Sequence, residues 1–142
     1  MDILGFDHPD DAYFFLEQDV WCRPLADGSM EVGVTSFGIH LSGDFYMCRP
    51  KPPGTELSQG QTVAVAELSK SVVAIRTPVS GRVVEANPLL EDTPELVHRE
   101  PYGRGWLVRI APTRWDEDLA RLVHGDALVA AATVRMRLED LE

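Results

Sequence analysis

The sequence lacks the features that mark several large classes of protein. Its two cysteines, Cys22 and Cys48, are too few for a disulfide framework and lack the paired spacing of a zinc site. No uninterrupted apolar run approaches the roughly 18 residues that a membrane-spanning helix requires. Residues 1–10 contain aspartates but no lysine or arginine, which is unlike a secretory signal. We therefore expect a cytoplasmic protein with reduced thiols and no membrane partner.

Basic residues are also scarce. The 142 residues include 13 Lys or Arg and 23 Asp or Glu, which gives a formal net charge of -10 at pH 7. Because this charge repels phosphate backbones, we expect no nucleic-acid partner. Only Lys51 and Lys70 are lysines. The acids before the first basic residue, Arg23, indicate either a solvated face or a docking surface for a basic partner. These acids are Asp2, Asp7, Asp10, Asp11, Glu17 and Asp19.

Short strands separated by turns dominate the middle of the chain. The β-branched runs 62–67 and 72–76 are joined by only four residues, which favours a hairpin with Lys70 at its tip. A short capped helix is predicted at 37–41, and the proline-rich stretch 50–54 predicts an irregular loop. Further strands are predicted at 21–23, 30–34, 45–48, 82–86 and 106–110. The pattern predicts a mainly β (α+β) fold, either an antiparallel sandwich or a flattened barrel, with short helices.

Two helices are predicted to close the chain within 113–142. The acids of 116–118 favour the positive end of a helix, and Gly125 is typical of a helix stop. The alanine- and leucine-rich segment 127–138 then predicts the second helix. No linker divides the sequence, so we expect residues 1–142 to form a single domain with the C-terminal helices packed on it.

No familiar catalytic or metal-binding motif is present. The histidines lack the spacing that would place two metal ligands on one face, and no Gly-x-Ser-x-Gly elbow marks a hydrolase nucleophile. Cys22 and Cys48 lie on predicted strands, so they are either buried, inert thiols or a redox pair. We expect no catalytic residue and no metal ligand. Surface or packing roles are expected for His8, His40, His98 and His124.

Lys70 has two interpretations. Charged residues are common at exposed hairpin tips, so a solvated lysine is the simpler one. Alternatively, a lysine at the apex of a rigid hairpin, flanked by the small residues Ser69 and Ser71, suits enzymatic acylation. Acylation removes the charge and creates a long arm whose far end carries a reactive group, while the protein supplies placement and docking. The second interpretation predicts a carrier protein and not a catalyst.

Several stretches between Trp21 and Ile110 share the residues of a known family. They are Val32–Thr35, Gly43–Asp44, Glu67–Lys70, Pro78–Gly81, Pro94–Val97, Pro101–Gly103 and Gly105–Leu107. Together they resemble the H-protein family, the lipoyl carriers of the glycine cleavage system. That family's motif has a glutamate three residues before its lipoylated lysine, as Glu67 precedes Lys70. The resemblance implies a biotinyl/lipoyl-type hybrid antiparallel sandwich that carries lipoic acid in amide linkage to Lys70.

The family that this chain resembles has two branches, and each implies different partners. Glycine cleavage H proteins typically have the sequence Glu-Ser-Val-Lys-Ala at the lysine and a histidine just before the early tryptophan. This chain has Glu-Leu-Ser-Lys-Ser at 67–71 and Val20 before Trp21. These departures favour the second branch, the lipoate-binding proteins that accompany heterodisulfide-reductase-like complexes in bacterial sulfur oxidation. The alternative is the H protein of glycine cleavage, which carries the aminomethyl group and is reoxidised by dihydrolipoamide dehydrogenase.

Both branches imply the same first partner, a lipoate ligase or lipoyl-transfer enzyme that modifies Lys70. A further alternative, of a different class, is an interaction module that keeps the fold without being lipoylated. A redox enzyme that uses Cys22 and Cys48 is another. Because each alternative depends on different side chains, substitutions at Lys70 and at the cysteines distinguish them.

Overall fold

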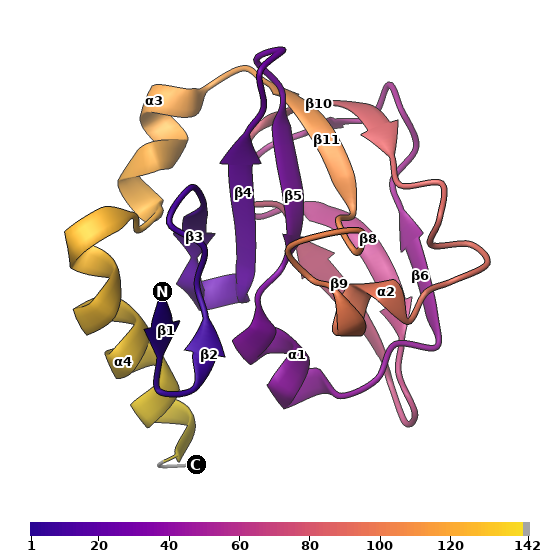
Figure 1. The fold of residues 1–142 in the computed structure, drawn as a ribbon. Helices are drawn as coiled ribbons and strands as arrows, with labels where there is room; N and C mark the ends of the chain where they lie inside the picture. The colour runs from indigo at the N-terminus through magenta and orange to yellow at the C-terminus, as the bar shows by residue number, and fades with distance from the viewer. Residues whose placement is uncertain (141–142) are drawn as a thin grey trace.

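The computed structural model describes residues 1–140 and consists mainly of antiparallel sheet (Figure 1). The larger sheet has the strand order β3-β4-β5-β11-β10-β7, and the smaller has the order β6-β8-β9. The strands of the larger sheet are β3 (Tyr13–Phe15), β4 (Val20–Pro24), β5 (Met30–Val34), β11 (Val108–Pro112), β10 (Gly81–Ala86) and β7 (Glu56–Leu57). The strands of the smaller sheet are β6 (Met47–Pro50), β8 (Thr62–Glu67) and β9 (Val72–Arg76). The predicted mainly β, flattened-sandwich class is confirmed.

Short helices and turns surround the two sheets. The chain begins with a hairpin of β1 (Asp2–Ile3) and β2 (Phe6–Asp7). The helices are α1 (Ser36–Ser42), α2 (Leu96–Arg99), α3 (Trp115–Asp118) and α4 (Leu128–Asp140). The 3-10 turns are η1 (Leu16–Gln18), η2 (Leu119–Arg121) and η3 (Gly125–Ala127). Within residues 1–140, none of the helices combines the length and apolar character needed to cross a membrane.

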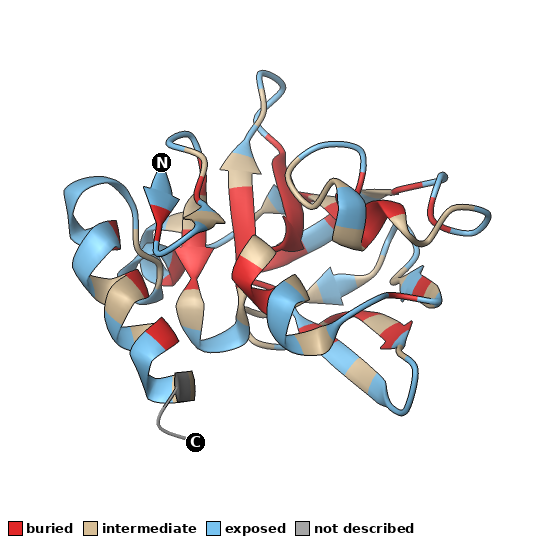
Figure 2. Cartoon of the chain, turned by 60° about the horizontal axis from the view of Figure 1, so that its bottom comes forward, coloured by how far each residue is buried: buried red, intermediate tan, exposed pale blue. Residues whose placement is uncertain are grey.

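The main core lies between the two sheets. Val20, Val32 and Ile110 of the larger sheet are buried in one cluster with Val63 and Ile75 of the smaller sheet. Figure 2 shows buried residues along the central strands and exposed residues at the hairpin tips and on the outer surfaces of the helices. The shared core fixes the small sheet against the large one, so the β8–β9 hairpin has a rigid base.

A second core cluster holds the C-terminal helix. Leu128 and Met136 of α4 pack with Phe14 and Trp21 of the neighbouring strands β3 and β4. In this way the described part of 113–142 packs on the sheets, while its last two residues lie outside the described range. The helix therefore covers one end of the large sheet (Figure 1).

The first of the two predicted C-terminal helices is shorter than expected. α3 has only four residues and continues as the 3-10 turn η2. Asp118, the last residue of α3, has a buried carboxylate that accepts hydrogen bonds from the Ser80 N–H at 2.6 Å and from Ser80 Oγ at 3.1 Å. The acids of 116–118 therefore do more than favour a helix start, because one of them attaches α3 to the turn before β10.

Two strands are shifted from their predicted positions. β6 begins two residues late because the Phe45 N–H donates to His98 Nδ1 and not to a neighbouring strand. β6 also includes Pro50, for which an irregular loop was expected. The Lys51 N–H donates to the Val63 carbonyl oxygen, so the alternate residue Pro50 turns its nitrogen away from β8 and no ladder bond is lost. β11 is shifted by two residues in the same direction.

Candidate functional site

Lys70 lies at the tip of the β8–β9 hairpin. The two strands end in the pair Glu67 and Val72, and the Leu68 N–H donates to the Ser71 carbonyl oxygen at 2.8 Å across the turn. The predicted hairpin is confirmed, with Lys70 exposed at its tip. The amine is therefore open to reaction from solvent.

Burial fixes the base of this hairpin. Val63, Ala64 and Ala66 of β8 and Ile75 of β9 all belong to the main core. β8 is the middle strand of its sheet, so hydrogen bonds hold it on both sides. The tip is consequently displayed from a rigid support, on the opposite side of the molecule from α4 (Figure 1).

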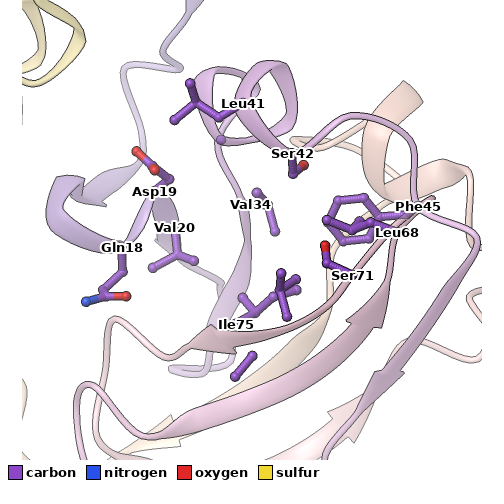
Figure 3. A pocket seen from close by; sticks show the side chains of 13 residues that line it. Gln18, Asp19, Val20, Val34, Leu41, Ser42, Phe45, Leu68, Ser71 and Ile75 are labelled. Atoms are coloured by element: carbon purple, nitrogen blue, oxygen red, sulfur yellow. The ribbon is translucent and has the colours of Figure 1, made fainter. Parts of the chain in front are cut away.

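A cavity of about 390 Å³ lies beside the hairpin (Figure 3). Its walls come from the hairpin, from α1 and from the segment that joins η1 to β4. Ser71, which follows Lys70 in the chain, lines the cavity, so the lysine and the cavity adjoin. Most of the lining is apolar. The larger apolar side chains are Val20, Val34, Leu41, Phe45, Leu68 and Ile75.

Among the described residues that line this cavity, Asp19 supplies the acidic side chain. Its φ of 56° lies in the left-handed region, and a Cβ at Gly38 would lie only 2.8 Å from Asp19 Cβ. Arg135 Nη2 of α4 donates to Asp19 Oδ2 at 2.8 Å. Burial raises the pKa of Asp19, and the Arg135 guanidinium opposes that rise by a smaller amount. The carboxylate is thus held in one position and partly desolvated.

Phe45 forms the opposite wall and is held by a histidine. The Phe45 N–H donates to His98 Nδ1 at 2.9 Å, and His98 Nε2 lies 3.8 Å from Asp44 Oδ1. Because Nδ1 accepts a hydrogen bond, the neutral ring must carry its proton on Nε2, which faces the Asp44 carboxylate. This arrangement attaches the loop between α1 and β6 to α2, and so fixes the shape of the cavity wall.

Two residues of this site are not identified as such from the sequence. Asp19 is one of several acids that precede the first basic residue, and His98 is one of four scattered histidines. Neither position carries a motif, and the contacts that bring them to one cavity join distant segments of the chain. The one local feature that fits the structure is the residue type at position 19, because Asp adopts the left-handed conformation observed there more readily than most residues do.

The two cysteines do not form a reactive site. Cys22 lies in β4 and Cys48 in β6, so they belong to different sheets, and both side chains are buried. Burial raises the pKa of each thiol to about 12. Since the thiolate is the nucleophilic form, both thiols are unreactive at neutral pH. The alternative of an enzyme that uses them therefore has no support in the structure.

The remaining histidines pack against neighbouring groups. His8 is buried, its Nδ1 lies 2.9 Å from the Phe6 carbonyl oxygen, and its ring packs against Phe14. Burial lowers the pKa of His8. The ring of His124 stacks on Tyr13, with centroids 4.2 Å apart. In residues 1–140, no three His, Cys, Asp or Glu side chains come together in a group that could hold a metal ion.

Some acids of the N-terminal region are paired with cations of the same chain. Asp11 Oδ1 lies 3.7 Å from Arg23 Nη1, and Glu17 Oε2 lies 3.2 Å from Arg121 Nη2. Exposed pairs of this kind add little stability, but they reduce the charge that this face presents. A basic partner for the acidic face remains a prediction.

The chain is similar to known proteins of a single family, both in sequence and in structure. The family model described as "Glycine cleavage H-protein" matches residues 13–134. "Glycine cleavage system H protein 2" of Aquifex aeolicus is 35% identical over 133 residues, which covers 94% of this chain and 83% of that protein. The "Glycine cleavage system H protein" of Paraburkholderia xenovorans is 40% identical over 113 residues, covering 80% and 88%. A crystal structure of a glycine cleavage system H protein from Mycobacterium marinum matches with a TM-score of 0.68 and 32% identity, over 75% of this chain and 87% of that one.

Proposed function

Because the chain belongs to the glycine cleavage H-protein family, we propose that it is a lipoyl carrier of the glycine cleavage system, with the lipoyl group in amide linkage to Lys70. The exposed position of Lys70 at the tip of a rigid hairpin is the observation that supports this most directly. Under this proposal the protein acts with partner enzymes and supplies no catalytic residue of its own.

The glycine cleavage branch replaces the sulfur-oxidation branch that the sequence departures favour. The relatives described above carry the name of glycine cleavage H proteins. The departures around Lys70 concern Leu68, Ser69 and Ser71 in the hairpin turn; Ser69 and Ser71 are exposed, and Leu68 supplies an apolar side chain to the cavity lining. Turn residues of this kind vary readily without changing how a hairpin displays its tip. The departures at positions 68, 69 and 71 are therefore weak support for the sulfur-oxidation branch.

The residues around Lys70 fit a lipoyl group. Ser69 and Ser71 are small and exposed, and they leave the amine open to an acylating enzyme. When bound, a lipoyl group supplies a disulfide and dithiol pair that can accept a small group and be reoxidised. The chain's contribution is to fix the base of the arm and to present it to successive partners.

The cavity beside the hairpin would accommodate the free end of a lipoyl arm attached to Lys70. Its apolar walls suit a hydrocarbon chain and sulfur atoms. Asp19 adds a carboxylate that suits a cationic amine, the group that an aminomethyl cargo carries. These residues would shield a group held there from water.

Several partners follow from this function. A lipoate ligase or lipoyl-transfer enzyme attaches the arm, the other glycine cleavage enzymes load and unload it, and dihydrolipoamide dehydrogenase reoxidises it. The segment 1–142 acts as a single carrier domain, with the helices of 113–142 packed on the sandwich.

Lipoylation in vitro tests the assignment of Lys70. Recombinant protein is incubated with a lipoate ligase, ATP and lipoic acid, and the product is mapped by peptide mass spectrometry. We expect one lipoyl group on wild-type protein and none on Lys70→Arg, because arginine keeps the charge but cannot be acylated in this way. Lys51→Arg is the matched control, since Lys51 is the other lysine in the chain, and it should be lipoylated like wild type.

The assignment would be contradicted by wild-type protein that stays unmodified, or by a lipoyl group that persists in Lys70→Arg. Glycine decarboxylation by the reconstituted partner enzymes provides the second readout. It should depend on the modified protein and be lost with Lys70→Arg but not with Lys51→Arg. Activity that survives Lys70→Arg would favour a module that needs no lipoyl group.

A further inference from the structure

Helix α4 carries a buried apolar stripe and a second, mostly exposed apolar stripe on a different part of its surface. One stripe, which includes Leu128, Ala132 and Met136, is buried in the second core cluster. The other is solvent-facing and includes Val134 and Leu138, whose relative exposures are 59% and 55%. A surface helix normally presents polar residues on the face away from the core. The outer stripe therefore requires an explanation other than intramolecular packing.

The outer stripe has the spacing of a helix-pairing seam. It comprises Ala127, at the end of the turn that leads into α4, followed by Ala131, Val134 and Leu138. Successive members are separated by four, three and four residues. This alternation is the heptad spacing by which two helices pack side by side with interlocking side chains. The two alanines permit close approach of a second helix backbone.

We propose that α4 pairs with α4 of a second copy of this chain, antiparallel and across a two-fold axis. The small residues lie in the first half of the stripe and the large ones in the second half. Antiparallel pairing places Ala127 opposite Leu138 and Ala131 opposite Val134, so each large side chain meets a small one. Parallel pairing would instead oppose two leucines and two alanines, which fills the interface unevenly. The stripe is thus complementary to itself only in the antiparallel direction.

Charge supports the same orientation. Asp126 and Arg137 are both exposed and lie along the same edge of the stripe, near its opposite ends. A two-fold axis keeps that edge on one side of the pair, so each Asp126 faces the Arg137 of the other copy. Two Asp126–Arg137 ion pairs therefore lie on the same side of the apolar seam, one toward each end, as expected for antiparallel self-association through an isologous contact.

The position of α4 leaves the proposed carrier site accessible. The helix and the β8–β9 hairpin lie on opposite sides of the molecule (Figure 1). Pairing through α4 therefore keeps both copies of Lys70 directed away from the interface. The contact is short, so the dimer is weak and concentration-dependent. It does not depend on lipoylation, and it is independent of the proposed function.

Sedimentation equilibrium tests the pairing. At about 0.15 M salt, where the Debye length is about 8 Å and the repulsion between copies is screened, we expect the mass to rise toward twice 15.8 kDa with protein concentration. Val134→Glu should raise the dimer dissociation constant at least about tenfold, because it buries a charge in the seam. Val129→Glu is the matched control: Val129 is exposed on the same helix but outside the stripe, and this change should leave the constant unaltered.

A charge reversal tests the orientation. Asp126→Arg alone should weaken the dimer, and adding Arg137→Asp should restore it, since the reversed pair again has opposite signs. Circular dichroism establishes that each variant is folded. A mass of 15.8 kDa at every concentration up to the millimolar range would overturn the proposal. A dimer that is unchanged by Val134→Glu would overturn it equally.

Discussion

At the residue scale, Asp19 is held in the cavity from two sides. On one side, Asp19 lies so close to Gly38 that a side chain at position 38 would collide with Asp19 Cβ. From the other side, Arg135 both donates to Asp19 Oδ2 and donates through Nε to the Leu16 carbonyl oxygen at 3.1 Å. The carboxylate is therefore positioned before any ligand arrives, which reduces the ordering that binding requires.

Asp19→Asn should expose the cargo without preventing lipoylation. The amide cannot offer a negative charge to a cationic amine, so we expect an aminomethyl load to be lost to water about tenfold faster. The measurement is release of formaldehyde or ammonia from the loaded protein over time. Glu17→Gln is the control, because Glu17 is a nearby acid that does not line the cavity. Equal rates in both variants would show that the carboxylate does not hold the cargo.

His8 makes stability depend on pH. Burial lowers the pKa of His8 below the ordinary histidine value of about 6.5, so the unfolded chain takes up a proton at a pH where the folded chain does not. The contribution of the neutral ring to stability is present above about pH 6.5 and is lost progressively as the pH falls below it. We expect His8→Gln to flatten the loss of unfolding free energy between pH 7 and 5, as measured by urea titration. A slope identical to that of wild type would exclude His8 as its source.

At the element scale, the link between α3 and the turn before β10 depends on one side chain. The Asp118 carboxylate accepts from both the backbone and the hydroxyl of Ser80, and both residues are buried. Asp118→Ala leaves a buried N–H without a partner, which costs about 1–3 kcal/mol. Asp116→Ala, at a residue exposed on the same helix, is the control and should change stability by no more than about 0.5 kcal/mol. Denaturant midpoints measure both.

Regular elements with a local signal are predictable from this sequence. The 62–67 and 72–76 runs are β-branched and joined by four residues, and they form the β8–β9 hairpin as expected. Helix α1 likewise begins where Thr35 accepts a hydrogen bond from the Gly38 N–H and ends at Gly43. In both cases neighbouring residues determine the structure.

Elements that depend on distant contacts are not predictable in this way. β1, β2 and β7 have two residues each, too few to produce a periodic pattern. The cavity is a stronger example, since its walls combine α1, the hairpin and the residues after η1. The sequence predicts Lys70 because a hairpin places it, but it gives no indication that Asp19 or His98 contributes to the same site.

At the scale of the whole molecule, the sandwich separates two surfaces. The tip of the β8–β9 hairpin, which carries Lys70, lies on one side, and α4 lies on the other (Figure 1). The shared core makes the scaffold between them rigid, so an arm attached at Lys70 is the moving part in this account. A carrier of this design can exchange partners at one side while the opposite side pairs with a second copy.

The mass of the protein purified from its native host tests whether Lys70 carries the proposed lipoyl arm. Intact mass and peptide mapping, under conditions that preserve labile adducts, should find one lipoyl group on Lys70, with an aminomethyl load in part of the population. A lipoyl group with an added sulfur species would instead assign the carrier to sulfur oxidation. An unmodified Lys70 would contradict the carrier function and leave that residue as a solvated lysine at a hairpin tip.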